Sequence, residues 1–381
     1  MQHFLAIEAS SGILLVLATV VALAWANSPW RHSYADVWAR SIGPVIGPID
    51  LHLDLLHWVN DGLMATFFFV VGLEIKREWV SGELRDRRAA VLPAFAALGG
   101  MVVPALLFVA LTAGTIAAHG WGIPMATDIA FAVGVVTLLG DRVPPTLKLF
   151  LLTLAIVDDV GAIAVIALVY SGPLAWGWLA SAAAVIGLAL VLRATRVTNT
   201  AVFLSIGVVL WVCAHQSGVH PTIAGVVMAL LLPADNGRWE ERLHPWTSNA
   251  VVPLFALANA GIALSSPTGS AGGGRVLLGV VVGLVIGKTV GVSTFAWLAV
   301  RMGWGRLPVG VRWAQVVGVA AVAGIGFTVS LFVTGLAFDE GAVVRQAKLG
   351  TLLASLIAAT LGAALLVRAS GGPAAPEAVD Q

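Results

Sequence analysis

The sequence predicts an all-α membrane protein with about twelve transmembrane helices, two of them broken, arranged as inverted repeats. Of its 381 residues, 59% are hydrophobic and only 11% are charged, whereas soluble domains carry about 25% charged residues. Mean hydropathy is +0.95. Apolar segments long enough to cross the hydrocarbon core as helices recur along the chain. These observations indicate an integral membrane protein with little mass outside the bilayer.

The apolar segments define the spans in chain order, with ends placed to about 2–4 residues. The first segment is interpreted as an uncleaved span, because the N-terminus lacks the basic region and small-residue cleavage site of a signal peptide. Together the spans form a single transmembrane domain over 1–369. They lie near 10–27, 55–76, 91–112, 121–140, 147–170, 174–193, 200–214, 218–233, 249–264, 276–300, 312–337 and 347–368.

Two segments are expected outside the membrane. Gly-Pro pairs and β-branched residues predict a small periplasmic hairpin within 40–54. Residues 370–381 are rich in Pro, Ala and Gly and predict a disordered cytoplasmic tail. The single cysteine, Cys213, excludes an internal disulfide and suggests no metal cluster.

Lysine and arginine positions orient the chain. With twelve spans, both termini and every even-numbered loop share one side, which holds fifteen of the 21 lysines and arginines. The opposite side holds five, and Lys288 lies inside a span. By the positive-inside rule, both termini are cytoplasmic.

Two adjacent carboxylates at membrane depth are the most informative feature. Asp158 and Asp159 lie in the middle of the apolar run 149–170. Each ionised carboxylate there costs about 2.5–3.5 kcal/mol on insertion scales, so both must face a protein interior or a water-filled cavity, where charged groups usually serve ion movement. Adjacent helical residues point about 100° apart. The pair therefore cannot share one proton face to face, which weighs against an aspartic-protease dyad.

Other ionisable groups at this depth are few. They are Asp128 and Lys288, with Asp61 and Glu74 near the ends of the second span. Lys288 is the only basic group, so the carboxylates are its natural partners. Three aspartates and one lysine leave a net negative charge, which favours a cation site. The alternative is a packing ion pair between Lys288 and one aspartate.

Two predicted spans are interrupted. Pro124 breaks the fourth span, in which Thr127 and Asp128 are residue types that cap helix N-termini. Gly324 and Gly326 interrupt the eleventh span, although close helix packing also explains these glycines. Interrupted spans in corresponding positions of two halves indicate a transporter site between inverted repeats. Spans three to five and ten to twelve run in opposite senses, as that symmetry requires.

Two predicted cytoplasmic segments contain both acidic and basic residues, and the second also contains a histidine. A histidine with an unperturbed pKa of about 6.5 can sense pH, while a solvated loop with surface ion pairs is the alternative. His220 lies at a helix start and is compatible with a dimer contact, a pH-responsive group or a cap. The residues of the two segments are Glu74, Arg77 and Glu78 in the first and Glu240, Glu241 and His244 in the second.

This set of residues resembles the NhaA family of bacterial sodium/proton antiporters, whose members have inverted repeats. The resemblance runs over nearly the whole chain. Its motifs are WVNDGLMA at 58–65, VGLEIKRE at 71–78, PMATDIAF at 124–131, LAIVDDVG at 154–161, SGVH at 217–220, GK at 287–288 and GIGFT at 324–328.

The resemblance implies an electrogenic Na⁺(Li⁺)/H⁺ antiporter, pH-regulated and not an enzyme, which extrudes sodium in exchange for external protons by alternating access. It implies that Asp159 is the main cation and proton carboxylate, with Na⁺ or Li⁺ bound at Asp158 and Asp159. Asp158 is expected to contact Lys288 in some states. Thr127 and Asp128 are expected where the two broken helices cross, and there Asp128 and Lys288 balance the half-helix dipoles.

The resemblance also implies a homodimer in the bacterial inner membrane, with the lipid bilayer as partner, no nucleic acid or nucleotide, and no cofactor beyond the transported ions. Two departures from the family pattern are Glu241, where a second histidine is usual, and Thr289, where a proline often follows the lysine. The first bears on the pH threshold, and the second leaves the transport chemistry intact. The implied pH-sensing residues are Glu74, Arg77, Glu78, Glu240 and His244.

Two other functions fit parts of the pattern. A sodium-coupled symporter of an organic anion requires a larger substrate cavity on the same fold. An intramembrane aspartyl protease requires two aspartates on separate helices, which the adjacent pair does not provide. The absence of a P-loop motif from the sequence argues against an ATP-driven pump.

Overall fold

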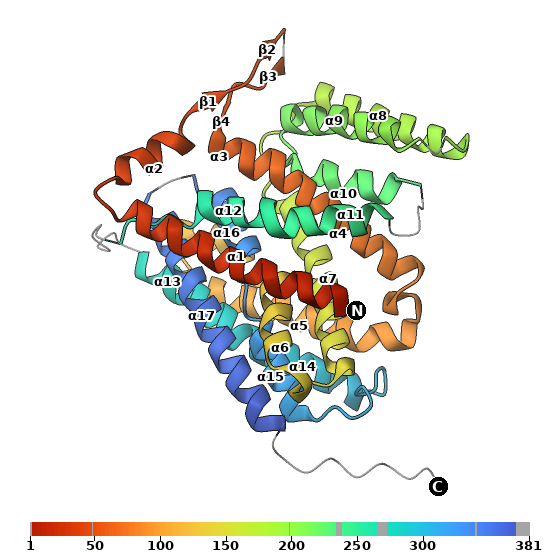
Figure 1. The fold of residues 1–381 in the computed structure, drawn as a ribbon, viewed down its shortest axis with the longest axis vertical. Helices are drawn as coiled ribbons and strands as arrows, with labels where there is room; N and C mark the ends of the chain where they lie inside the picture. Colours follow the sequence, from red (N-terminus) through yellow and green to blue (C-terminus); the bar gives the residue numbers. More distant parts are fainter. Residues whose placement is uncertain are drawn as a thin grey trace. The chain divides into compact units, whose positions relative to one another are not determined.

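The computed structural model describes residues 2–47, 49–197, 199–233, 238–264, 273–339 and 341–370. These residues are almost entirely helical (Figure 1), which confirms the predicted all-α fold. Within them, seven helices are long and apolar enough to cross a membrane, and three bent helix pairs raise the number to ten. The predicted disordered tail lies, beyond Ser370, outside the described residues.

Two of the twelve predicted spans correspond to shorter helices. The segment 218–233 forms α10 (Thr222–Leu231), which Pro221 and Pro233 bound at its two ends. The segment 249–264 forms α12 (Val252–Asn259), which follows directly on a π-helical stretch. Beyond Asn259 the backbone leaves the helical pattern.

The predicted single domain comprises two compact units. Unit 1 contains Gly82–Ala162 and the described residues of 1–12 and 267–381. Its helices α5 and α14 pack along each other. A side chain at Gly99 would meet the Gly291 carbonyl, and one at Gly291 the Gly99 carbonyl, so the two backbones touch. Its elements are η2 (Glu83–Arg85), α5 (Arg87–Thr112), η3 (Ile116–Met125), α6 (Ile129–Leu138), η4 (Gly140–Arg142), most of α7 (Pro145–Val169), α13 (Gly273–Val281), η6 (Val282–Gly287), α14 (Lys288–Arg301), α15 (Trp313–Val322), α16 (Phe327–Ala337) and α17 (Ala342–Ser370).

Unit 2 contains Ile13–Ser81 and Ile163–Ser266. Its hydrophobic core includes Phe69, Phe203 and Met228, and α8 and α9 lie side by side (Figure 1). Its elements are most of α1 (Gln2–Ala26), α2 (Arg31–Trp38), β1 (Ser41–Ile42), β2 (Val45–Ile46), β3 (Ile49–Asp50), β4 (Leu53–Asp54), α3 (Leu55–His57), η1 (Trp58–Leu63), α4 (Met64–Val80), α8 (Trp176–Ala194), α9 (Thr200–Ser217), α10, α11 (Arg238–Trp246), η5 (Thr247–Val251) and α12.

The segment predicted as a hairpin carries the four strands. β1 pairs antiparallel with β4, with Ser41 opposite Asp54, and β2 pairs antiparallel with β3, with Val45 opposite Asp50. In Figure 1, β2 and β3 form the tip. The position of these strands on the periplasmic side stays a prediction.

Candidate cation-binding site

Two helices of unit 1 are broken, as predicted, and their breaks hydrogen bond to each other. η3 and α6 bend by 45° at their junction, and α15 and α16 bend by 48°. The Asp128 amide donates to the Ile325 carbonyl at 2.6 Å. The Thr127 hydroxyl lies 2.8 Å from the Ala323 carbonyl. These hydrogen bonds satisfy polar backbone groups at the breaks, because irregular backbone at membrane depth is tolerated only where such groups find partners.

Asp128 caps the first turns of two helices at once. One carboxylate oxygen, Oδ1, accepts from the Phe131 amide of α6 at 3.0 Å. The other, Oδ2, accepts from the Thr328 amide at 3.0 Å and the Thr328 hydroxyl at 2.7 Å, in the first turn of α16. A helix N-terminus carries partial positive charge. The buried carboxylate therefore lies where two such charges meet, and it ties the two breaks together.

Asp158 on α7 lies at the centre of a buried polar group. Its Oδ2 accepts from Lys288 Nζ and, at 2.7 Å, from the Thr127 hydroxyl, while Lys288 Nζ is 3.0 Å from Thr127 Oγ1. Asp158 and Lys288 are both 0% exposed. Among the described residues, no group hydrogen bonds to Asp158 Oδ1, so this buried oxygen can accept a further ligand.

The Thr127 hydroxyl has a single hydrogen to donate and lies within hydrogen-bond distance of two acceptors. Asp158 Oδ2 lies at 2.7 Å and the Ala323 carbonyl at 2.8 Å, so the hydroxyl donates to one of them at a time. A charged Asp158 competes more strongly for that hydrogen than a neutral one. The hydroxyl therefore links the charge of Asp158 to the second break.

Asp159 follows on the same helix and is also buried. At 3.6 residues per turn, its side chain leaves α7 in a different direction from that of Asp158. Asp159 is close enough to Lys288 for the two charges to interact. Lys288 thus bonds to Asp158 directly and interacts with Asp159 through its charge.

Lys288 reaches this group because α14 lies against α5. The π-helical segment η6 directly precedes Lys288, and π-helical turns are frequent at functional sites. A side chain at Gly100 would come within 3.5 Å of Lys288 Cδ and 3.8 Å of Nζ. Gly100 therefore leaves the space in which the lysine side chain lies.

The predicted site residues of unit 1 thus lie close together in the structure. Thr127, Asp158 and Lys288 share direct bonds, with Asp128 next to Thr127 at the break and Asp159 next to Asp158 on α7. Carboxylate, hydroxyl and carbonyl oxygens are hard ligands, which hard cations prefer. Unwound backbone in a broken transporter helix commonly supplies such carbonyls. The donor set suits a small cation or protons.

The predicted pH-sensing residues lie in unit 2 and pair across α4 and α11. Arg77 bonds to Glu240 and lies 3.5 Å from Glu78. His244 Nε2 lies 3.5 Å from Glu74 Oε1. The three acids and His244 are buried, so this is a packed ion-pair group and not the solvated loop of the alternative interpretation.

Burial raises the pKa of Glu240, and the Arg77 guanidinium offsets only part of that effect. Because the folded-state pKa is raised, protonation of Glu240 favours the fold. This stability is complete below the unfolded pKa of about 4.3 and is lost as the pH rises through the raised folded pKa. The pair with Arg77, a partly exposed side chain, adds only about 0–1 kcal/mol.

Glu240→Gln is therefore expected to flatten the pH dependence of stability. Glutamine keeps the shape and stays neutral, so the variant should lose less Tm than the wild type between about pH 4 and about pH 9. The matched control is Glu241→Gln at the exposed neighbouring position, which should follow the wild type. Identical profiles of Tm against pH for Glu240→Gln and the wild type would contradict the raised pKa of Glu240 in the folded state.

Sequence reasoning missed the partners of two aspartates, Asp128 and Asp61. Thr328 stands in the motif GIGFT, yet only the structure shows it bonding to Asp128; a hydroxyl residue in the first turn after the glycine break was the available signal. In unit 2, His215 Nδ1 lies 3.9 Å and His220 Nε2 3.5 Å from Asp61 oxygens. His220 Nδ1 also lies 2.7 Å from the Thr222 hydroxyl and accepts from the Thr222 amide at 3.4 Å, at the start of α10.

Many apolar spans, two broken helices bonded at their breaks and buried carboxylates beside them define a secondary transporter. The fold is shared with the sodium proton antiporter MjNhaP1 from Methanocaldococcus jannaschii, solved at pH 8. The TM-score is 0.54 and the identity 12%, with 97% of this chain and 98% of that one covered. At this identity the likeness shows the fold alone.

Sequence comparison gives the family. The Na⁺/H⁺ antiporter 1 family matches residues 2–366. The Na(+)/H(+) antiporter NhaA of Pseudomonas putida (strain GB-1) is 46% identical over 382 residues, covering 97% of this chain and 98% of the relative. That of Rhodospirillum rubrum is 47% identical over 389 residues, covering 97% and 98%. The chain belongs to the NhaA family of bacterial Na⁺/H⁺ antiporters, a family of multi-pass membrane transporters.

Proposed function

We propose that the protein is an electrogenic antiporter that extrudes Na⁺ or Li⁺ in exchange for external protons, by alternating access at Asp158 and Asp159. The observation that carries the proposal is the buried group of Asp158, Lys288 and Thr127 at a helix break, with Asp159 beside it. A carboxylate at this depth must be neutralised by a proton, a lysine or a metal cation. Exchange of these three partners is the transport chemistry.

The state described here has Asp158 paired with Lys288. We infer that the cation enters at Asp159 and draws on the open Oδ1 of Asp158. A carboxylate must lose its proton before it holds a cation, so protons and Na⁺ compete for the same oxygens. A site that opens to one side of the membrane at a time then couples the two flows without ATP.

Charge movement follows from the number of protons released. If two protons leave for each Na⁺ that binds, one net charge crosses per cycle. The membrane potential then contributes about 2.3 kcal/mol per 100 mV to each turnover. Competition also predicts that apparent Na⁺ affinity rises with pH. The buried Glu240 and His244 group is proposed to shift this profile, because Glu240 gains charge as the pH rises.

Currents on a solid-supported membrane test the electrogenic cycle. Proteoliposomes given a Na⁺ or Li⁺ step should show a transient current whose sign reverses when the Na⁺ gradient is reversed. Fluorescence of a pH-sensitive dye in the same vesicles reports exchange independently. Exchange without current would show an electroneutral cycle, and an absence of both would contradict the antiport function.

The remaining features of the proposal concern assembly. The excess of lysine and arginine on one side supports cytoplasmic termini in the bacterial inner membrane, and the family relationship supports a homodimer. Reporter fusions at the two termini test the orientation. Light scattering of the purified protein in detergent measures the mass of the assembly.

A further inference from the structure

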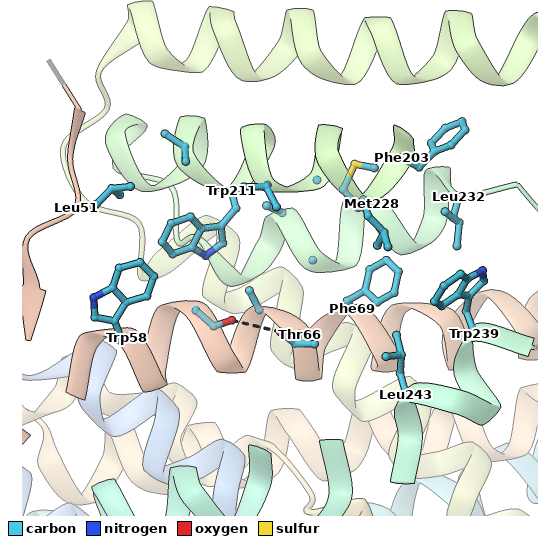
Figure 2. A pocket seen from close by; sticks show the side chains of 18 residues that line it. Leu51, Trp58, Thr66, Phe69, Phe203, Trp211, Met228, Leu232, Trp239 and Leu243 are labelled. Carbon is cyan, nitrogen blue, oxygen red and sulfur yellow. Dashed lines mark hydrogen bonds between the residues drawn. The ribbon is translucent and has the colours of Figure 1, made fainter. Parts of the chain in front are cut away.

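The cavity of about 490 Å³ in unit 2 does not suit a bare cation. Its lining is apolar and aromatic, and among the described residues that line it Thr66 alone carries a hydroxyl (Figure 2). That hydroxyl lies 3.5 Å from the Gly62 carbonyl, one turn earlier in the chain. A cation that has lost its water needs several hard oxygens around it. Unit 1, where buried hydroxyls and carbonyls meet at the breaks, is the better place for such oxygens.

Each broken span of unit 1 directs one hydroxyl to a carbonyl of the other span. The Thr127 hydroxyl, at the first break, lies 2.8 Å from the Ala323 carbonyl, at the C-terminal end of α15. The Ser330 hydroxyl, in the first turn of α16, donates to the Ile123 carbonyl at 2.6 Å, in the last turn of η3. The inverted repeats thus place the same chemistry, a hydroxyl on the carbonyl end of a half-helix, at two positions.

The two carbonyl ends differ in what balances their charge. The C-terminal end of a helix carries partial negative charge. At the α15 end, Lys288 Nζ lies 3.0 Å from the Thr127 hydroxyl oxygen and supplies a full positive charge. Lys288 belongs to the tenth predicted span, and the matching third span forms α5, which has no basic residue after Arg88. The repeat therefore duplicates the hydroxyl and the carbonyl without the lysine.

Three uncharged oxygens gather at the η3 end, around Gly326. A side chain at Gly326 would come within 2.5 Å of Ser330 Oγ and 2.9 Å of the Ala126 carbonyl oxygen, so both oxygens lie against this glycine. The Ile123 carbonyl joins them through its bond to Ser330. A hydroxyl that donates its hydrogen keeps two lone pairs, and a carbonyl that accepts one bond keeps a second. These oxygens can therefore bind a cation while the hydrogen bond persists.

The oxygens at the η3 end lie next to the carboxylates. Ala126 directly precedes Thr127, whose hydroxyl is 2.7 Å from Asp158 Oδ2. Ala126 and Thr127 are both 0% exposed, so an ion at this position is shielded from water. Asp128 adds a negative charge nearby, because its Oδ2 accepts from the Thr328 hydroxyl in the first turn of α16. A cation is therefore favoured here over an anion.

We propose that the Ser330 hydroxyl and the carbonyls of Ile123 and Ala126 form a second, uncharged cation subsite, which Na⁺ or Li⁺ occupies on its way to or from Asp159. The transported cation has at η3 the role that Lys288 has at α15, which is to balance the carbonyl end of a half-helix. This subsite rests on the antiport function proposed above, because it assigns a step to the transported ion. Uncharged oxygens hold the ion less tightly than carboxylates do, so the subsite passes it on.

The number of oxygens in the subsite distinguishes Na⁺ from Li⁺. Selectivity between hard cations follows the size of the cavity and the number of ligands. The larger Na⁺ surrounds itself with more oxygens than the smaller Li⁺, so the loss of one oxygen weakens Na⁺ binding more. A residue that only supports the fold would change the apparent affinities for the two ions by the same factor.

The test replaces the hydroxyl oxygen and keeps the space that it fills. In Ser330→Cys the thiol is close in size and stays a weak donor for the Ile123 carbonyl, but sulfur is a soft ligand that suits hard cations poorly. Ser330→Ala removes the group altogether. The matched controls are Ser355→Cys and Ser355→Ala, at a buried serine of α17 whose hydroxyl has no hydrogen-bond partner among the described residues.

Exchange is measured in proteoliposomes with a pH-sensitive dye, with Na⁺ and with Li⁺. Both Ser330 variants should raise the apparent KM for Na⁺ about tenfold, as expected for the loss of one uncharged ligand, and the KM for Li⁺ by a clearly smaller factor. Both Ser355 variants should match the wild type for both ions. An unchanged KM for Na⁺ in Ser330→Cys, or equal factors for the two ions, would overturn the proposal.

A binding measurement separates the subsite from the antiport function. A cation that binds the folded protein raises its Tm by mass action. In detergent, Na⁺ should raise the Tm of the wild type and of Ser355→Cys more than that of Ser330→Cys, whereas Li⁺ should raise all three by similar amounts. Equal Na⁺-induced shifts in the wild type and Ser330→Cys would contradict the subsite alone. Wild-type vesicles that show no exchange with either ion would instead contradict the antiport function.

Discussion

Asp159→Asn is expected to reduce Na⁺-driven proton movement to background in proteoliposomes. Asparagine keeps the shape of the buried side chain but cannot take up or release a proton. It offers a desolvated cation a neutral oxygen in place of a charged one. The remaining carboxylate, Asp158, is already bonded to Lys288 and Thr127. A pH-sensitive dye inside the vesicles measures the effect on addition of Na⁺ or Li⁺.

The matched control is Asp141→Asn, which makes the same change at an exposed position of unit 1. This variant should exchange as the wild type does. Normal electrogenic exchange by Asp159→Asn, in vesicles that contain as much protein as the wild-type vesicles do, would contradict the assignment of Asp159 as the cation carboxylate.

Asp158→Asn separates the roles of the two carboxylates. The substitution leaves the buried Lys288 without its ion-pair partner, a loss that costs about 3–5 kcal/mol in other proteins. The variant should therefore have a lower Tm, and it should either lose exchange or exchange without current. Wild-type currents from Asp158→Asn would show that Asp158 carries no charge through the cycle.

The broken helices were predictable because their causes are local. Pro124 removes a helical hydrogen bond and precedes two capping residues, and Gly324 and Gly326 weaken the helix that they interrupt. The position of Asp158 at membrane depth was also predictable from the sequence. The free-energy cost of burying a charge there follows from the apolar residues around it along the chain.

Other features depend on contacts between distant segments. Thr328 stands just after the glycine break, but its position in the sequence does not identify its partner as Asp128, which lies two hundred positions earlier. The length of α10 was overestimated because hydropathy does not register the helix-ending effect of Pro221 and Pro233. The direct bond between Lys288 and Asp158 was expected only from the family resemblance, because charge alone permits any of three aspartates as partner.

Lys288→Ala is expected to lower both the Tm and the apparent Na⁺ affinity. Lys288 is 0% exposed and donates to Asp158 and Thr127. Its loss leaves a buried carboxylate unpaired, at a cost of up to about 3–5 kcal/mol. Asp158 recovers part of that cost by holding a proton, and Na⁺ must then displace this proton. Lys148→Ala, at a partly exposed position of unit 1, should leave both quantities unchanged.

Lys288→Arg distinguishes charge balance from proton transfer by the lysine. Arginine keeps its charge at every pH of interest, so it can pair with Asp158 but cannot release a proton during the cycle. If Lys288 only compensates the carboxylates, the arginine variant should retain most of the wild-type Tm and should still produce a Na⁺-induced current. The bulk of the guanidinium near Gly100 should reduce the rate. A folded arginine variant with wild-type Tm and no current would show instead that the lysine itself must give up its proton. Equal Tm and Na⁺ affinity for the wild type and Lys288→Ala would mean that the buried ion pair is incidental to both folding and transport.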